Sequence, residues 1–587
     1  MQLSAKLLLV ALGVLLALVL WGAFGWHSRK TVVHADVLAG PAGPATGTSP
    51  TLFVLVHGYN PSQKLWAQMA QTLQPHGAVL RLRYNAGPFS NADPDEITRR
   101  MSDEIAKATT ATGATRVVLV AHSMGALLTR RTLLLAHSQA QPWFKQVQRV
   151  VLLAGVNRGW DVSGEPPADA STLNRWLYRG VYWWARLLGT SSLIFEFERG
   201  SRFVANLRLD WMRWMHDTPR DEQLEVVQLL GDIDEIVSRE DNEDLRVISS
   251  ARFALLRVRG TGHADIIDLG LAKRANAEKR ELGEYRKQKL MLAATGDFNE
   301  VRLHNEAQLP KPNEAITELV FVLHGIRDLG RWSARFETEI RRQFPARREQ
   351  LAIVSSRYGY LGMGPFLFPG VREKYVRWFM DEYTEALARY PHVKPENIRF
   401  FGHSNGSYIL AKALERYASM KIDRVVFAGS VVPRNYAWAE RSAQVNKVRN
   451  YVGTQDWVVA LFPRLFELPL VRLLHNDLGS AGFNGFDACM VDNVRFVKGE
   501  HSAFEDRVGE IVDFLLRPDA PPPARKEDRD TWLGEALSWS PTVLTVWAFL
   551  LALVVYLGAR VVSASPSPTW PVLLLYALLV LGVLRTV

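Results

Sequence analysis

The sequence contains a single cysteine, Cys489, among 587 residues. One cysteine cannot form a disulfide within the chain or build a cysteine-rich zinc site. The sequence also lacks basic runs interleaved with aromatic residues and lacks nucleic-acid-binding motifs, which argues against a DNA- or RNA-binding protein. Hydrophobic residues make up 48% of the chain and charged residues 22%, a composition that excludes global disorder and a collagen-like fibre.

The charge of the chain is only mildly unbalanced, with 70 basic against 60 acidic residues and a formal net charge of +10. A solvated basic surface accounts for such an excess, and attraction to anionic lipid headgroups is the alternative. At roughly 150 residues per domain, the length allows about three or four domains, or two large ones. The chain is therefore long enough to bury a substantial core.

Charge is absent from three long apolar runs near the ends of the sequence. The first, residues 7–26, is about twenty residues long, enough to cross a bilayer. Its length and its final Trp26 favour a retained transmembrane anchor over a cleaved signal peptide. Residues 543–559 and 570–584 predict a transmembrane helical hairpin over 542–587. The stretch 518–541, which contains three consecutive prolines and many charges, predicts an exposed linker.

Lysine and arginine residues beside these runs predict the orientation of the chain, because cytoplasmic flanks carry an excess of both. The flanks that face the central region carry six basic residues: Arg29, Lys30, Arg517, Arg525, Lys526 and Arg529. The opposite flanks carry only Lys6 and Arg560. The bias predicts an integral membrane protein, of a bacterial inner membrane, with its central domains and Arg585 on the cytoplasmic side.

A pattern of apolar strand, glycine turn and helix occurs twice in the central region. The apolar residues 52–56 and 319–323 each run into a His-Gly pair. Further along each copy, an apolar strand leads into a Ser-containing pentapeptide, AHSMG at 121–125 and GHSNG at 402–406. A helical pattern and another apolar strand follow each pentapeptide. This alternation of strands and helices predicts a largely parallel α/β sheet in each copy.

The two copies resemble the α/β-hydrolase family, specifically its lipase and esterase members, over roughly 48–275 and 315–517. The family places a nucleophilic serine in a small-x-Ser-x-Gly pentapeptide, on a sharp turn between a strand and a helix. Ala121 replaces the usual first glycine in the first copy. The resemblance implies two α/β-hydrolase-type domains with mostly parallel sheets, joined by a linker over 276–314. It implies Ser123 and Ser404 as the nucleophiles.

The family's chain order of serine, acid and histidine implies the other members of each triad. In the first copy they are Asp234 and His263, with Asp232 as the alternative acid. In the second copy they are Asp456 and His501. Each acid follows an apolar strand and a glycine, and each histidine follows the last strand of its copy.

The resemblance also implies an oxyanion hole made of backbone N–H groups in each domain. One donor follows each nucleophile, at Met124 and Asn405. The other follows each His-Gly pair, at Tyr59 and Ile326. This chemistry requires no metal and no organic cofactor.

The first copy carries an insertion that the second lacks. Asp234 lies 111 residues after Ser123, whereas Asp456 lies 52 residues after Ser404. The additional chain, at about 157–222, is rich in aromatic residues and stands where the family commonly inserts a cap. It predicts a lid over an acyl-binding pocket or a patch that touches the bilayer. A small core of the cap's own is the alternative.

Together these patterns predict a membrane-anchored serine hydrolase that cleaves carboxylic esters, of the lipid or acyl type, in both domains. Its partners are then the lipid bilayer and a small-molecule or lipid ester. Two alternatives stay open. In the first, one domain is an active hydrolase, such as a thioesterase or a peptidase, and the other domain is regulatory. In the second, the chain is a non-enzymatic membrane scaffold.

Overall fold

The computed structural model describes most of the central region and part of the C-terminal region. The described residues are 28–29, 31–40, 50–59, 61–87, 90–160, 192–219, 222–234, 252–272, 276–306, 313–326, 331–356, 361–362, 366, 369–453, 455–467, 477–497, 501–517, 536, 539–563, 574 and 576. The chain forms two compact units, Met1–Lys311 and Pro312–Val587. The predicted anchor at 7–26 lies outside the described residues.

The first unit is built on a seven-stranded sheet with the order β1-β3-β2-β4-β5-β6-β7. Its strands are β1 (Val33–Leu38), β2 (Thr51–Val56), β3 (Ala78–Tyr84), β4 (Arg116–His122), β5 (Val147–Leu153), β6 (Glu225–Gly231) and β7 (Phe253–Val258). Only β1 runs antiparallel to its neighbour, β3, and the other neighbouring strands are parallel. The central strands are near-continuous apolar runs because helices cover both of their faces.

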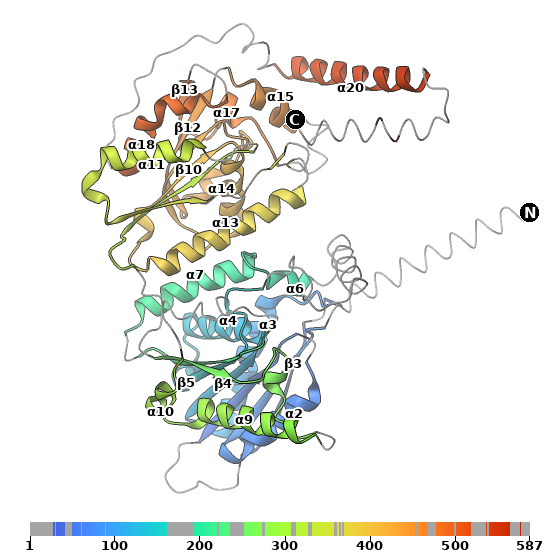
Figure 1. Ribbon diagram of the computed structural model, residues 1–587, viewed down its shortest axis with the longest axis vertical. Coiled ribbons are helices and arrows are strands. Elements are labelled where there is room, and N and C mark those ends of the chain that lie inside the picture. Colours follow the sequence, from blue (N-terminus) through green and yellow to red (C-terminus); the bar gives the residue numbers. More distant parts are fainter. Residues whose placement is uncertain are drawn as a thin grey trace, which may run out of the picture. The chain divides into compact units, whose positions relative to one another are not determined.

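Helices cover both faces of the first sheet, as Figure 1 shows. The helices of this unit are α2 (Gln63–Leu73), α3 (Pro94–Thr112), α4 (Gly125–Ser138), α6 (Ser192–Glu196), α7 (Arg202–Asp217), α9 (Ala277–Thr295) and α10 (Phe298–Leu303). Successive strand residues point to opposite faces. Leu52 and Val54 therefore pack in the core with residues of α3, α4 and α7, and Phe53 and Leu55 pack with residues of α2, α9 and α10.

The segment 276–314, for which the sequence predicts a linker, contributes α9 and α10 to the first unit. Leu290 and Ala293 of α9 and Val301 of α10 are buried in the core of that unit. The backbone N–H of Glu306, after α10, also donates to the carbonyl of Leu255 in β7 at 2.9 Å. The described part of this segment is therefore an outer layer of the first domain.

The second unit is built on a six-stranded sheet with the order β13-β12-β11-β10-β8-β9. Its strands are β8 (Glu318–Leu323), β9 (Leu351–Ser356), β10 (Ile398–His403), β11 (Ile422–Ala428), β12 (Val445–Gly453) and β13 (Val491–Val497). Every neighbouring pair is parallel. The two sheets confirm the predicted α/β fold with mostly parallel strands.

Helices also lie on both faces of the second sheet (Figure 1). The helices of this unit are α11 (Arg331–Gln343), α13 (Pro369–Arg389), α14 (Asn405–Arg416), α15 (Trp457–Leu465), α17 (Ala481–Asn484), α18 (Val508–Leu516) and α20 (Ser540–Ser563). One face packs Phe401 against Phe336 of α11 and Ile511 of α18. The other face packs Phe321 and Phe400 against the ring of Phe379 in α13.

Helix α20 coincides with the predicted apolar run at 543–559. Among the described residues it is the one helix long and apolar enough to cross a membrane, over Pro541–Arg560, with a mean hydropathy of 2.2 and 12% of that window buried. The run at 570–584 is described only at Leu574 and Tyr576. The Tyr576 hydroxyl donates to the carbonyl of Val554 at 2.6 Å, so this tyrosine lies against α20.

Candidate active sites

Ser123 stands on a sharp turn between β4 and α4. Its φ of +55° lies in the left-handed region that non-glycine residues rarely adopt. The backbone N–H of Ser123 donates to the carbonyl of Leu153 in β5 at 3.0 Å, which holds the turn at the carboxyl edge of the sheet. Gly125 is required two residues later, because a Cβ there would lie 2.5 Å from the carbonyl oxygen of His57.

The structure brings Ser123, His263 and Asp234 into one hydrogen-bonded chain. His263 Nε2 lies 2.9 Å from Ser123 Oγ, and His263 Nδ1 lies 3.1 Å from Asp234 Oδ2. The alternative acid, Asp232, points elsewhere, since its Oδ1 accepts the backbone N–H of Thr261 at 3.2 Å. The side chains of His263 and Asp234 are 8% and 2% exposed, so water hardly screens their interaction.

The loop after β2 passes directly against the nucleophile. A Cβ at Gly58 would lie 2.8 Å from the Cβ of Ser123, so only glycine fits there. Tyr59 follows in this loop, and Met124 is the residue that precedes the first turn of α4. N–H groups at a helix start have no partner within the helix. Both residues predicted as oxyanion donors therefore lie beside Ser123.

His57 fixes the direction of the peptide that joins Gly58 to Tyr59. Its Nδ1–H donates to the carbonyl of Gly58 at 2.8 Å, and its Nε2 accepts the backbone N–H of Tyr84 at 3.2 Å. A trans peptide directs its N–H away from its C=O, so the hydrogen bond to the Gly58 carbonyl also fixes the N–H of Tyr59. Burial lowers the pKa of His57 to about 4, which keeps the ring in the neutral form that this pair of bonds requires.

His122 holds the backbone of His263, the candidate base of the first unit. Its Nε2–H donates to the carbonyl of His263 at 3.0 Å. Burial, with the nearby His263 ring as the next cause, lowers the pKa of His122 to about 3, so the imidazole stays neutral at ordinary pH. The residue that precedes the nucleophile in sequence therefore positions the base of the triad.

The second unit repeats the geometry of the nucleophile turn. Ser404 has a φ of +51°, and its backbone N–H donates to the carbonyl of Ala428 at 3.0 Å. A Cβ at Gly406 would lie 2.6 Å from the carbonyl oxygen of Leu323, and a Cβ at Gly325 would lie 2.8 Å from the Cβ of Ser404. The second oxyanion loop thus also lies against its serine.

Ile326 and Asn405, the predicted oxyanion donors of the second unit, lie beside this serine as well. Ile326 follows Gly325 in the loop after β8, and Asn405 is the first residue of α14. The Nδ1–H of His324 donates to the carbonyl of Gly325 at 2.8 Å, as His57 does to Gly58. His403 Nε2–H donates to the carbonyl of His501 at 3.1 Å, as His122 does to His263.

The acid and the base of the second triad also meet. His501 Nδ1 lies 2.8 Å from Asp456 Oδ2, and the other oxygen of Asp456 accepts the backbone N–H of Val459 at 3.0 Å. Burial opposes protonation of His501, but the charge of Asp456 and its hydrogen bond outweigh burial and raise the pKa of His501. Asp456 therefore caps α15 and orients the imidazole with the same carboxylate.

One contact of the first triad is not repeated in the second, since among the described residues no hydrogen bond joins Ser404 Oγ to His501 Nε2. The ring of His501 instead lies close to Gly429, where an added Cβ would be 2.8 Å from His501 Cε1. The first unit has Ala154 at the equivalent position after β5, with a φ of +45° against +55° at Gly429. Glycine in the second unit leaves room for the ring beside the strand.

The sequence-based interpretation missed the roles of four histidines: His57, His122, His324 and His403. It used the His-Gly pairs only to place the oxyanion donors and drew nothing from the histidine before each serine. A signal was present, because both histidines recur at the same positions in the two copies.

The described residues of the predicted cap pack in the hydrophobic core of the first unit. In α7, Phe203, Leu207 and Trp211 are buried in the cluster that covers one face of the first sheet. The guanidinium of Arg130 in α4 lies over the ring of Trp211, 4.9 Å from its centroid. Residues 161–191, which include Trp183 and Trp184, lie outside the described residues.

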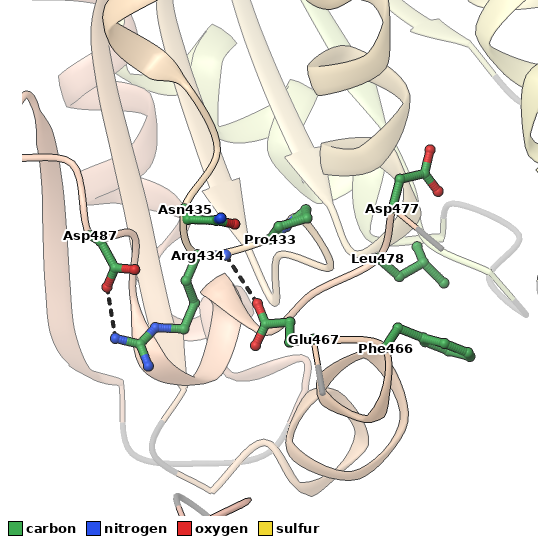
Figure 2. A pocket seen from close by; sticks show the side chains of 8 residues that line it. All are labelled: Pro433, Arg434, Asn435, Phe466, Glu467, Asp477, Leu478 and Asp487. Atoms are coloured by element: carbon green, nitrogen blue, oxygen red, sulfur yellow. Dashed lines mark hydrogen bonds and ion pairs between the residues drawn. The ribbon is translucent and has the colours of Figure 1, made fainter. Parts of the chain in front are cut away.

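The second unit also contains a cavity of about 430 Å³. Figure 2 shows its lining residues, Pro433, Arg434, Asn435, Phe466, Glu467, Asp477, Leu478 and Asp487. Glu467 accepts the backbone N–H of Arg434 at 3.0 Å, and the Arg434 guanidinium pairs with Asp487 at 2.7 Å. Ser404, Asp456 and His501 are not among the residues that line this cavity.

Part of the first unit matches a known protein family. Residues 53–276 match the sequence profile of the Alpha/beta hydrolase family. No curated protein matches the chain.

Among solved structures, the chain is similar to Est1E from Butyrivibrio proteoclasticus with bound ferulic acid, at 14% identity over 45% of this chain and 96% of that chain, with a TM-score of 0.28. It is similar to carboxyl esterase 2 from the mycorrhizal fungus Tuber melanosporum, at 17% identity over 44% of this chain and 88% of that chain, with a TM-score of 0.27. It is also similar to the esterase RhEst1 from a Rhodococcus species, at 15% identity over 44% and 94%, with a TM-score of 0.27. The family match over 53–276, with the parallel sheet that carries it, supports membership of the first unit in the alpha/beta hydrolase family.

Proposed function

We propose that the chain is a membrane-anchored serine hydrolase that cleaves carboxylic esters, of the lipid or acyl type, by acyl transfer in two domains. The observation that carries the proposal is the chain of hydrogen bonds from Ser123 through His263 to Asp234, at 2.9 and 3.1 Å. A serine hydroxyl becomes a nucleophile when a base beside it can take its proton. A carboxylate behind the base holds the imidazole and stabilises its cation.

The proposed reaction uses only groups of the protein and water. Ser123 Oγ attacks the ester carbonyl carbon while its proton passes to His263 Nε2. The N–H groups of Tyr59 and Met124 stabilise the negative oxygen that forms. The C–O bond to the alcohol then breaks, and His263 returns the proton to the departing oxygen. Water repeats the sequence on the acyl-serine, releasing the carboxylic acid and restoring the serine.

We propose that the second domain catalyses the same reaction with Ser404, His501 and Asp456. The repeated turn, oxyanion loop and histidine contacts support this. The missing hydrogen bond between Ser404 and His501 favours the alternative, in which the first domain is the hydrolase and the second is regulatory. Hydrogen bonds in unliganded active sites are often long and tighten when substrate binds, so the proposal keeps both domains active.

Membrane attachment is supported by α20, whose window Pro541–Arg560 has a mean hydropathy of 2.2. In this proposal α20 is the first helix of the predicted hairpin over 542–587. The charge-free run at 7–26 supplies a second anchor. Lysine and arginine beside the runs favour a cytoplasmic location for both domains.

A fluorophosphonate probe tests the function, because it reacts with serines that a neighbouring base has activated. In the full chain we expect labelling of both Ser123 and Ser404, with hydrolysis of esters in a panel of rising acyl length. Ser123→Ala and Ser404→Ala should each remove one label, and the double variant should remove all ester hydrolysis. Ser138→Ala and Ser442→Ala, which change exposed serines of the two units, are the matched controls.

The pattern of labels separates the candidates. Labelling of Ser123 alone, with ester hydrolysis that ends in Ser123→Ala, would support the hydrolase with a regulatory second domain. No labelling of either serine in a folded chain would overturn the proposal in favour of a membrane scaffold.

A further inference from the structure

Helix α15 connects the acid of the second triad to the membrane-length helix. Asp456 caps the start of α15, and its Oδ2 lies 2.8 Å from His501 Nδ1. One turn later, the carbonyl of Leu461 accepts the indole N–H of Trp547 in α20 at 2.9 Å. Leu461 is five residues after Asp456, roughly 7.5 Å along the axis of a helix. The point where α20 docks is therefore close to the catalytic centre.

The beginning of α20 packs against α15 of the second unit. Val543 is fully buried and Trp547 is partly buried, both in the first two turns of the helix. Beyond them most of the described residues are exposed, for example Phe549 at 67% and Val555 at 64%, and Gly558 is buried beside Tyr576. The first two turns fix α20 to α15, and the remaining turns leave the domain.

The exposed part of α20 is apolar around its whole circumference. Five consecutive residues, 553–557, are all between 38% and 64% exposed, and all are apolar or aromatic. Successive residues of a helix are about 100° apart, so five of them cover every direction. A helix that docks on a partner protein needs one apolar face, whereas a helix that is apolar all round belongs in hydrocarbon. The occupant that this surface fits is a lipid bilayer.

Tryptophan side chains are exposed at the same end of the second unit. Trp457, which follows Asp456 directly, is 48% exposed, and Trp539, just before α20, is 66% exposed. Tryptophan is enriched at the level of the lipid headgroups, where its ring and its N–H are both accommodated. The headgroup layer is roughly 5 to 8 Å thick on each side of a bilayer, comparable to the separation of Asp456 and Leu461 along α15.

We infer that the second active site opens at the bilayer surface and takes its substrate, a lipid ester, from the bilayer. The inference rests on the proposed function, since it assigns a substrate source to the Ser404 site. With α20 in the bilayer, α15 lies in the headgroup layer, and Asp456, His501 and Ser404 lie at its edge. An acyl ester at headgroup depth then reaches Ser404 without crossing water.

Lipid quenching at two positions of the full chain tests this placement. In a Cys489→Ser background, Trp457→Cys and Glu349→Cys each carry a bimane label, and the chain is reconstituted in phosphatidylcholine–phosphatidylglycerol vesicles that contain a doxyl-labelled lipid. Glu349 is exposed and precedes β9, at the amino edge of the same sheet, a strand length of about 20 Å away. We expect the label at 457 to be quenched at least threefold more than the label at 349. Equal quenching, or none at 457, would overturn the inference.

A second measurement separates the docking contact from the chemistry. In a Ser123→Ala background, only Ser404 remains to hydrolyse esters. Trp547→Phe removes the indole N–H and keeps an aromatic ring, and Tyr556→Phe, an exposed position in the middle of α20, is the matched control. We expect Trp547→Phe to lower hydrolysis of a vesicle-embedded fluorogenic phospholipid at least fivefold, with hydrolysis of p-nitrophenyl acetate within twofold. Tyr556→Phe should change neither rate.

The outcomes distinguish the inference from the function on which it rests. If the Ser123→Ala chain hydrolyses neither ester and Ser404 does not react with a fluorophosphonate, the proposed function of the second domain has failed. If it hydrolyses p-nitrophenyl acetate but never the vesicle ester, the function stands and the inference is wrong. Crosslinking of the label at 457 to a second copy, without lipid quenching, would assign this surface to an oligomer and also overturn the inference.

Discussion

Individual histidines hold the backbone around both candidate nucleophiles. His57 and His324 each donate Nδ1–H to the glycine carbonyl of the oxyanion loop, at 2.8 Å in both units. The order of serine, acid and histidine along the sequence points to Asp234, with Asp232 as the alternative, and His263 lies beside Asp234 in the structure. The sequence could not assign His122, because the carbonyl that this ring contacts belongs to a residue 141 positions away. Such a role exists only once the loops after two strands have met.

Removing the donor at His57 should weaken the oxyanion hole of the first domain. In a Ser404→Ala background, we expect His57→Ala to lower kcat by about 10²–10³-fold with little change in KM, because the peptide that carries the Tyr59 N–H is no longer fixed. His57→Asn keeps an N–H donor near the position of Nδ1 and should retain most of the activity. Equal losses in both variants would show that His57 has only a packing role.

The pH dependence of the second site should reflect the raised pKa of His501. Burial opposes protonation, but Asp456 outweighs it, so the folded pKa lies above the ordinary value of 6.5. A general base must be neutral, so activity is present above this pKa and is lost as the pH falls through it. In a Ser123→Ala background, the acidic limb of kcat/KM should therefore have its midpoint above 6.5.

Replacing the acid provides the control for that pH profile. Asp456→Asn removes the charge and leaves burial as the main influence on His501. The midpoint should then move below that of the unmodified site, and the maximal rate should fall by up to about 10⁴-fold. An acidic limb that stays unchanged in Asp456→Asn would contradict the assignment of Asp456 as the partner of His501.

Strands and helices differ in how far the sequence predicts them. Strands buried on both faces, such as β2, β4 and β8, are continuous apolar runs, so they can be predicted directly from the sequence. Strand β1 (Val33–Leu38) is only partly buried, and it forms because it pairs antiparallel with β3, a contact that no local pattern encodes. Helix α9 is charge-rich and buries only a narrow stripe that includes Leu290 and Ala293, which explains why its segment resembles a linker.

The approach of α14 to β8 depends on Gly406. A Cβ there would lie 2.6 Å from the Leu323 carbonyl oxygen, and backbone atoms cannot move aside as a flexible side chain can. We expect Gly406→Ala to destabilise the second unit by about 1–3 kcal/mol and to abolish fluorophosphonate labelling of Ser404. Labelling of Ser123 should be unchanged. Thermal unfolding in detergent and labelling of the purified chain measure both effects.

Gly370, near the start of α13, is the matched control for Gly406. A Cβ at Gly370 would meet no atom within 4 Å, and alanine is the better helix former. Gly370→Ala should therefore leave unfolding and labelling of Ser404 unchanged or slightly improved. A similar loss in both variants would show that the effect comes from replacing any glycine in this unit, rather than from the contact with β8.

The chain contains the arrangement of strand, serine turn and helix twice and has apolar runs towards both ends. Each unit has its own sheet, its own serine turn and its own glycine loop beside that serine. The sequence could predict this duplication because buried strands and glycine turns leave local patterns. It could not predict whether Ser404 and His501 meet, because that depends on how the ring of His501 rests against Gly429.

The orientation of the whole molecule can be tested with its single cysteine. Cys489 is exposed on the second unit. The excess of lysine and arginine on the flanks of the central region predicts that this unit faces the cytoplasm. A membrane-impermeant maleimide should therefore leave Cys489 unlabelled in intact cells and label it after permeabilisation. Labelling in intact cells would reverse the orientation and leave the proposed chemistry untouched.

A cysteine on the predicted non-cytoplasmic side of the membrane completes the orientation test. Ser565 lies between the two predicted C-terminal spans, at 543–559 and 570–584. In a Cys489→Ser background, Ser565→Cys should react with the same reagent in intact cells, because a helical hairpin that starts in the cytoplasm turns on the far side of the bilayer. If neither cysteine reacts before permeabilisation, the hairpin does not cross the membrane. The bilayer-facing placement of the Ser404 site would then lose its anchor, whereas the hydrogen-bonded triad of the first unit would remain.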